Sequence, residues 1–142
     1  MKKLILLLTI VTLAAQVQAQ KINKSTVPKP AAATFKNAHP GVNDVDWKKN
    51  GDIFEAEYDV NKVETTDCYT AAGVLVETKE KLAAASVPAA IMAYVKKNYE
   101  EDEVRKAYKI TSAGGTVTYK AKVKGMILFF DSEGKFVKSV KA

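Results

Sequence analysis

The chain has 142 residues and a formal net charge of +6, but its charges are unevenly distributed. Residues 20–80 hold 8 lysines against 10 acidic side chains, a net charge of −2, whereas residues 81–142 hold 12 basic against 6 acidic side chains, a net charge of +6. A single cysteine excludes an internal disulfide, and a single histidine without a cysteine pair excludes a conventional zinc site and a histidine-dependent triad.

The first segment predicts export. Met1-Lys2-Lys3 is followed by the apolar run Leu4 to Ala15, and Val17-Gln18-Ala19 supplies the small residues of a cleavage site. We therefore expect residues 1–19 to be a signal peptide, cleaved after Ala19, and the protein to be periplasmic or secreted. Because the apolar run is shorter than the roughly 20 residues that cross a bilayer, we expect no stable membrane insertion after cleavage. Export also argues against a nucleic-acid partner for this basic chain.

A first helix is expected after Val27-Pro28, because proline is favoured at the start of a helix. Ala31 and Phe35 follow with the spacing of an amphipathic helix. His39-Pro40-Gly41 ends it, since a residue before proline avoids the helical region and glycine permits a sharp exit. His39 itself is interpreted as a surface histidine.

Beyond this helix the hydrophobic period changes to two, which is typical of strands. The apolar residues Phe54, Ala56, Tyr58 and Val60 alternate with the acidic residues Glu55, Glu57 and Asp59. Turns are predicted at Asn50-Gly51 and at Thr70-Ala71-Ala72-Gly73. Cys68 is interpreted as a half-buried small hydrophobic residue, with a reactive thiol or an intermolecular disulfide as alternatives.

The same order of elements recurs about 60 positions later. Val87-Pro88 begins a second helical period, with Ser86 as its expected cap, and Lys81 to Ser86 is read as a linker whose alanines can extend that helix upstream. A second alternating strand follows, made of Val117, Tyr119, Ala121 and Val123 interleaved with Lys120, Lys122 and Lys124. The chain is therefore interpreted as two tandem units, residues 20–80 and 81–142, each a helix followed by about four short antiparallel strands.

The second unit carries a resemblance to a known family. Val87-Pro88-Ala-Ala-Ile91, Tyr119-Lys-Ala-Lys-Val123 and Phe129-Phe-Asp-Ser-Glu-Gly-Lys135 resemble the PepSY-like family of exported bacterial proteins, which is related in fold to the beta-lactamase inhibitor protein. The first unit departs from the last motif with Cys68-Tyr69-Thr70-Ala-Ala-Gly73. The resemblance implies an α+β fold in which two tandem helix-plus-four-stranded antiparallel sheet units form one continuous curved sheet, with helices on one face and the other face open. It brings no catalytic residues, and in the inhibitor the open face binds another protein.

The two charged rows are the candidate binding residues. If the apolar faces pack under the helices, the acidic row Glu55, Glu57 and Asp59 and the basic row Lys120, Lys122 and Lys124 face solvent on the open side. They are either ordinary solvated faces or a bipolar docking surface for a protein partner or for a second copy arranged head to tail. Because neighbours on a strand point to opposite faces, only one of Phe129 and Phe130 can be core; Phe129 is assigned to the docking surface.

The first interpretation of function is a non-enzymatic exported binding module, including a protein inhibitor, that binds an unidentified envelope or secreted protein through the open sheet face without a cofactor. The alternative is a small-ligand or metal-handling periplasmic protein with a pocket between helix and sheet, which a deep apolar pocket with convergent polar groups would favour. An enzyme is disfavoured by the lack of catalytic constellations. The acidic run Glu100 to Glu103 is interpreted as a solvated loop, with weak calcium binding as the lesser alternative.

Overall fold

The computed structural model describes residues 19–99 and 103–142, and within them the chain forms a single nine-stranded antiparallel sheet in which every strand pairs with its neighbours in sequence. The strands are β1 (Gln20–Ile22), β2 (Asp46–Asn50), β3 (Ile53–Val60), β4 (Val63–Thr70), β5 (Leu75–Leu82), β6 (Lys106–Ser112), β7 (Val117–Val123), β8 (Met126–Phe130) and β9 (Phe136–Lys141). Residues 1–18 of the expected signal peptide and residues 100–102 of the acidic run lie outside the described residues.

Each of the two helices begins after a proline, as the sequence predicts. α1 (Lys29–Ala38) follows Pro28 and α2 (Ala89–Asn98) follows Pro88, and a short 3-10 turn precedes each of them: η1 (Lys24–Thr26) and η2 (Ala84–Ser86). The prediction that Ser86 caps α2 is wrong, and the alanines before it do not extend that helix. The reason is local, because Val87 precedes a proline and is held extended at φ −70° and ψ 128°.

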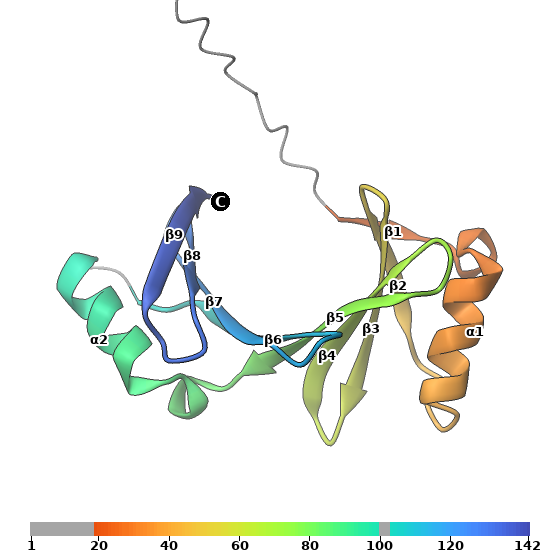
Figure 1. Ribbon diagram of the computed structural model, residues 1–142, viewed down its shortest axis with the longest axis horizontal. Helices are drawn as coiled ribbons and strands as arrows, with labels where there is room; N and C mark the ends of the chain where they lie inside the picture. Colours follow the sequence, from red (N-terminus) through yellow and green to blue (C-terminus); the bar gives the residue numbers. More distant parts are fainter. Residues whose placement is uncertain (1–18, 100–102) are drawn as a thin grey trace, which may run out of the picture.

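Both helices pack on the same face of the sheet. The strand register connects Tyr58 of β3, through Thr65, Glu80, Lys109 and Tyr119, to Phe130 of β8, so all six side chains share one face. We call this the helix face, and the opposite one the open face. Figure 1 shows the sheet curving between α1 and α2, which lie outside the curve at opposite ends of the molecule. The expected continuous curved sheet with helices on one face is confirmed.

The helix face carries two hydrophobic cores, one beneath each helix. Under α1, the ring of Phe35 meets Trp47 edge-on at 5.7 Å and Tyr58 edge-on at 5.1 Å. Under α2, Ile91 and Val95 pack with the buried side chains of β7 and β8. Phe35 is one of the apolar positions that the first helical period predicts.

The two halves join through strands β5 and β6. Glu77 to Leu82 pair with Ala107 to Ser112, so the sheet passes from one core to the other without a break. Lys81 and Leu82, expected to be linker, therefore belong to β5. The short strand β1 was not predicted, and it pairs with β2 at the edge of the sheet. Whether the halves are tandem copies of one unit remains an interpretation of the sequence.

Candidate functional site

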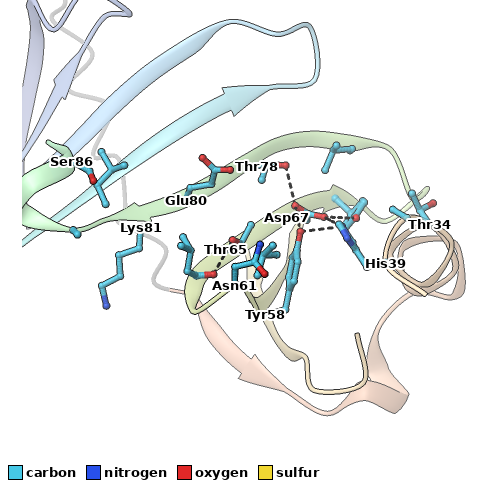
Figure 2. A pocket seen from close by; sticks show the side chains of 17 residues that line it. Thr34, His39, Tyr58, Asn61, Thr65, Asp67, Thr78, Glu80, Lys81 and Ser86 are labelled. Carbon is cyan, nitrogen blue, oxygen red and sulfur yellow. Dashed lines mark hydrogen bonds and ion pairs between the residues drawn. The ribbon is translucent and has the colours of Figure 1, made fainter. Parts of the chain in front are cut away.

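A cavity of about 710 Å³ opens on the helix face, between the end of α1 and strands β3 to β5 (Figure 2). Its apolar lining comes from Ala38, Val60, Val63, Leu75 and Leu82. Polar side chains from α1, β3, β4 and β5 gather at the end nearest α1. The cavity volume is within the range of about 300–1,000 Å³ that small-ligand sites occupy.

The carboxylate of Asp67, 3% exposed, is the centre of that polar end. Its Oδ1 accepts hydrogen bonds from the hydroxyls of Tyr58 at 3.2 Å and Thr78 at 3.0 Å. Its Oδ2 accepts from the hydroxyl of Tyr69 at 3.0 Å and lies 2.8 Å from Nε2 of His39. Because an ionised carboxylate only accepts, the proton of this imidazole must be on Nε2. We call these five residues the Asp67 cluster.

The prediction that His39 is a surface residue is wrong. As the C-terminal cap of α1, it lies over the sheet, and its ring is 4.6 Å from that of Tyr58. The side chain is 27% exposed, and Nε2 also lies 3.0 Å from the Tyr58 hydroxyl. The sequence did not reveal this because its carboxylate partner is 28 positions away along the chain.

The two tyrosines of the cluster keep their protons more firmly than free tyrosine does. Burial, together with the neighbouring charge of Asp67, raises the pKa of Tyr58 and the pKa of Tyr69. Both hydroxyls therefore remain donors to Asp67 throughout the physiological pH range.

The second half of the sheet has no counterpart of the Asp67 cluster. Asp67 pairs with Ala56, and the residue that pairs with the matching alanine, Ala121, is Leu128. When the two halves are aligned on these two alanines, Val123 corresponds to Tyr58 and Phe130 corresponds to Tyr69. Tyr99, which caps the C-terminal end of α2, corresponds to His39, which caps that of α1. A helix can thus be packed on this sheet with apolar side chains, so packing alone does not explain a buried carboxylate.

The open face holds both charged rows, but the acidic one is largely paired within the protein. Glu55 departs from the expectation of solvent exposure: it is 8% exposed, and its carboxylate lies 3.0 Å from the amine of Lys79 on β5. The carboxylate of Glu57 lies 2.6 Å from the amine of Lys48, whereas Asp59 is exposed at the end of β3. This pairing raises the pKa of Lys48, chiefly through its hydrogen bond to Glu57.

Cys68 lies among these ion pairs on the open face. It is 2% exposed, and burial raises the pKa of its thiol to about 12. A buried thiol with so high a pKa stays protonated and is a poor nucleophile. The structure therefore agrees better with Cys68 as a packing residue than with Cys68 as a reactive thiol.

The basic row is arranged differently from the acidic one. The register places Lys81, Tyr108, Lys120, Phe129 and Lys138 in one line across β5 to β9 on the open face, with lysine and aromatic side chains alternating. The amine of Lys120 lies 5.1 Å from the centre of the Tyr108 ring, and that of Lys138 lies 5.1 Å from the Phe129 ring. We call this line the lysine–aromatic row.

Lys81 pairs with Glu64 at 3.3 Å, but the lysines of β7 and of the turn after it form no ion pair in the described part of the chain. Lys122 and Lys124 are exposed, the latter in the β7–β8 turn, and within residues 19–99 and 103–142 neither they nor Lys120 form an ion pair. Burial, reinforced by the nearby charge of Lys79, lowers the pKa of Lys120. Phe130 is core at 1% exposure while Phe129 is partly exposed on the open face, which confirms that only one of this pair is core.

Over the described part of the chain, no group of three or more His, Cys, Asp or Glu side chains is placed to hold a metal ion. None of the helices in that part is long and apolar enough to span a membrane.

Comparison with solved structures finds the same fold in proteins from Bacteroides. A DUF2874 family protein from Bacteroides ovatus is 21% identical with a TM-score of 0.70, over 82% of this chain and 88% of that one. A candidate periplasmic protein from Bacteroides eggerthii is 15% identical with a TM-score of 0.71, over 81% and 88%. A BLIP-like protein from Bacteroides fragilis is 14% identical with a TM-score of 0.62, over 80% and 84%.

No protein-family model matches the sequence, and no curated protein matches it. At these identities the structural likeness establishes the fold alone, an α+β fold like that of BLIP-like proteins. The PepSY-like assignment remains an expectation from the sequence motifs.

Proposed function

We propose that this protein is a non-enzymatic, exported binding module that holds an acidic surface of a protein partner against the lysine–aromatic row of its open face. The supporting observation is the row itself, in which cations and rings alternate across five neighbouring strands. Lys81 pairs with Glu64, but Lys120 and Lys138 of the row, and Lys122 beside it on β7, have no ion-pair partner within the described residues. The likeness to BLIP-like and candidate periplasmic proteins fits a binding role in the cell envelope. Inhibition of the partner is the form of binding that this likeness suggests.

The chemistry of the open face defines the partner. Unpaired lysines attract carboxylates and increase the rate of association, while partly exposed rings such as Phe129 supply apolar contact area. The acidic half contributes less, because Glu55 and Glu57 already have lysine partners, and only Asp59 of the predicted acidic row is free of an ion pair in the described structure. This asymmetry favours a foreign acidic partner over head-to-tail pairing of two copies, which would need both rows.

The proposal is tested by capture of partners from the envelope fraction at low and high salt. The bait is the exported chain, and the variant carries Lys120→Gln, Lys122→Gln and Lys124→Gln. A matched control carries Lys36→Gln, Lys96→Gln and Lys97→Gln, the same loss of charge on exposed residues of α1 and α2. A captured protein should associate at least tenfold more slowly with the open-face variant and at an unchanged rate with the control.

Further experiments separate the proposed protein partner from the alternatives of a nucleic acid and a second copy of the chain. Phe129→Ser should weaken the complex by accelerating dissociation, since it removes apolar contact rather than charge. Titration with single-stranded DNA tests the expectation that the protein has no nucleic-acid partner. Sedimentation of the protein alone tests whether it associates with itself. Equal loss of capture in the two triple variants would refute a specific role for the open face.

A further inference from the structure

The hydroxyl groups around Asp67 in the cavity on the helix face already donate their protons within the protein. Six hydroxyls line it: those of Thr34, Tyr58, Thr65, Tyr69 and Thr78, and that of Ser86, which lies apart from the Asp67 cluster in Figure 2. Tyr58, Tyr69 and Thr78 donate to Asp67, Thr34 donates to backbone carbonyls at 2.9 and 3.0 Å, and Thr65 donates to the carbonyl of Val63 at 3.1 Å. Each of these oxygens can therefore only accept a further hydrogen bond.

The charges that line the cavity have the same preference. Asp67 lies behind the hydroxyls, and Glu80, two residues after Thr78 on the same side of β5, adds a second carboxylate without an ion pair in the described structure (Figure 2). Lys81 also lines the cavity, but its amine lies 3.3 Å from Glu64 and points away from the cluster in Figure 2. His39 is committed to Asp67 through Nε2. The hydroxyls around Asp67 thus present acceptors backed by negative charge, whereas the donors that remain in the lining are the side chains of Asn61 and Ser86.

The remaining lining is apolar and adjoins the polar end. Val60 and Val63, 42% and 41% exposed, lie at the open side of the cavity, and Leu75 and Leu82 are half-buried. An apolar chain placed here would cover side chains that otherwise face water.

We propose that this cavity binds a small organic cation: a primary amine with an apolar chain, whose ammonium group donates to the hydroxyl oxygens around Asp67 and faces Glu80. An ammonium group offers three donors and no acceptor, which complements a wall of acceptors backed by carboxylates. An organic anion would meet two carboxylates, and only the side chains of Asn61 and Ser86 line the cavity as uncharged donors without a hydrogen bond in the described structure. The absence of the cluster from the second half confines the site to α1 and strands β3 to β5.

The test uses three probes of one chain length: hexylamine, 1-hexanol and hexanoate. Each is titrated into the isotope-labelled exported chain while the methyl signals of Val60, Val63, Leu75 and Leu82 are followed by NMR. Hexylamine should shift these signals saturably, with an affinity at least tenfold above that of hexanoate and with hexanol in between.

Two variants locate the bound amine. Glu80→Gln should weaken hexylamine binding by about threefold to tenfold, as expected for a partly solvated charge pair. Its matched control, Glu133→Gln, removes an exposed carboxylate in the turn before β9 and should change nothing. Val63→Trp, at an exposed position, should fill the open side and abolish binding.

Several results would overturn the proposal: no saturable shifts with hexylamine, equal or tighter binding of hexanoate, or shifts outside the cavity. Hexylamine binding that is unchanged by both Glu80→Gln and Val63→Trp would also overturn the proposal. None of these residues belongs to the lysine–aromatic row, so partner capture by the open face should survive in both variants, and the two sites can fail independently.

Discussion

Asp67 on β4 and Leu128 on β8 occupy matching positions of the sheet, since each pairs with an alanine that is fully buried, Ala56 in one case and Ala121 in the other. One position beneath a helix thus accepts a carboxylate in the first half and a leucine in the second. The carboxylate is tolerated because four groups donate to it, and within the described residues no buried polar side-chain atom lacks a partner. The cluster is therefore stable only when all of its hydrogen bonds are present, and the loss of one member leaves buried polar groups unpaired, which lowers the stability of the protein.

Asp67→Leu alone should destabilise the protein by about 3 kcal/mol, because Tyr58, Tyr69 and Thr78 lose their common acceptor in a partly buried site. The free energy of unfolding is measured by urea denaturation. Combining it with His39→Tyr, Tyr58→Val and Tyr69→Phe, the residues of the second half, should recover most of that loss while abolishing amine binding. A fourfold variant as unstable as Asp67→Leu would contradict the view that the cluster serves binding rather than packing.

The Asp67 cluster should make the protein sensitive to alkali. The pKa of Tyr58 and the pKa of Tyr69 are raised above the ordinary value of about 10, so the folded state holds these protons more tightly than the unfolded state does. The resulting stability is fully present below about pH 10 and is lost as the pH rises toward the folded-state pKa values. Urea midpoints should therefore decline above pH 10, together with the appearance of phenolate absorbance. Tyr69→Phe should make that decline shallower; an unchanged slope would contradict the assignment.

The sequence predicted more of the fold than of the site, because the patterns that indicate the fold lie within a few neighbouring residues of the chain. The Pro28 and Pro88 helix starts, the switch to period two and the core role of Phe130 are local patterns, and each is confirmed. The Asp67 cluster depends on a contact across 28 positions, which no local pattern encodes. A weak signal existed, because Asp67 and Tyr69 are two positions apart on one strand and so share a face, but the sequence did not show that Tyr69 is buried, as it is in the structure. Similarly, the buried state of Glu55 depends on Lys79, which lies 24 positions later.

The ion pair between Lys79 and Glu55 should stabilise the open face more than the surface pairs do. Their side chains are 17% and 10% exposed, so Lys79→Met would leave a covered carboxylate without its cation, at a cost of about 2–3 kcal/mol in unfolding free energy. The matched control is Lys135→Met, since Lys135 and Glu133 form a pair with side chains 75% and 71% exposed. That change should cost less than about 0.5 kcal/mol. Equal costs in urea denaturation would show that Glu55 is solvated.

Gly73 tests how tightly the β4–β5 turn packs against the start of α1. Its backbone has φ +82°, and a Cβ atom there would lie 2.6 Å from the carbonyl oxygen of Pro30, too close for any side chain. Gly115, in the β6–β7 turn, has φ +90° and no atom within 4 Å of such a Cβ, so Gly115→Ala measures the backbone cost alone, about 1–2 kcal/mol. Gly73→Ala should cost about 1–3 kcal/mol more, because the turn or the helix must move. The same movement would shift Thr34, which donates to the carbonyl of Gly73, and so would distort the wall of the cavity. If the two alanine variants unfold at the same urea concentration, α1 is free to yield at its first turn, and the cavity is less rigid than its hydrogen bonds imply.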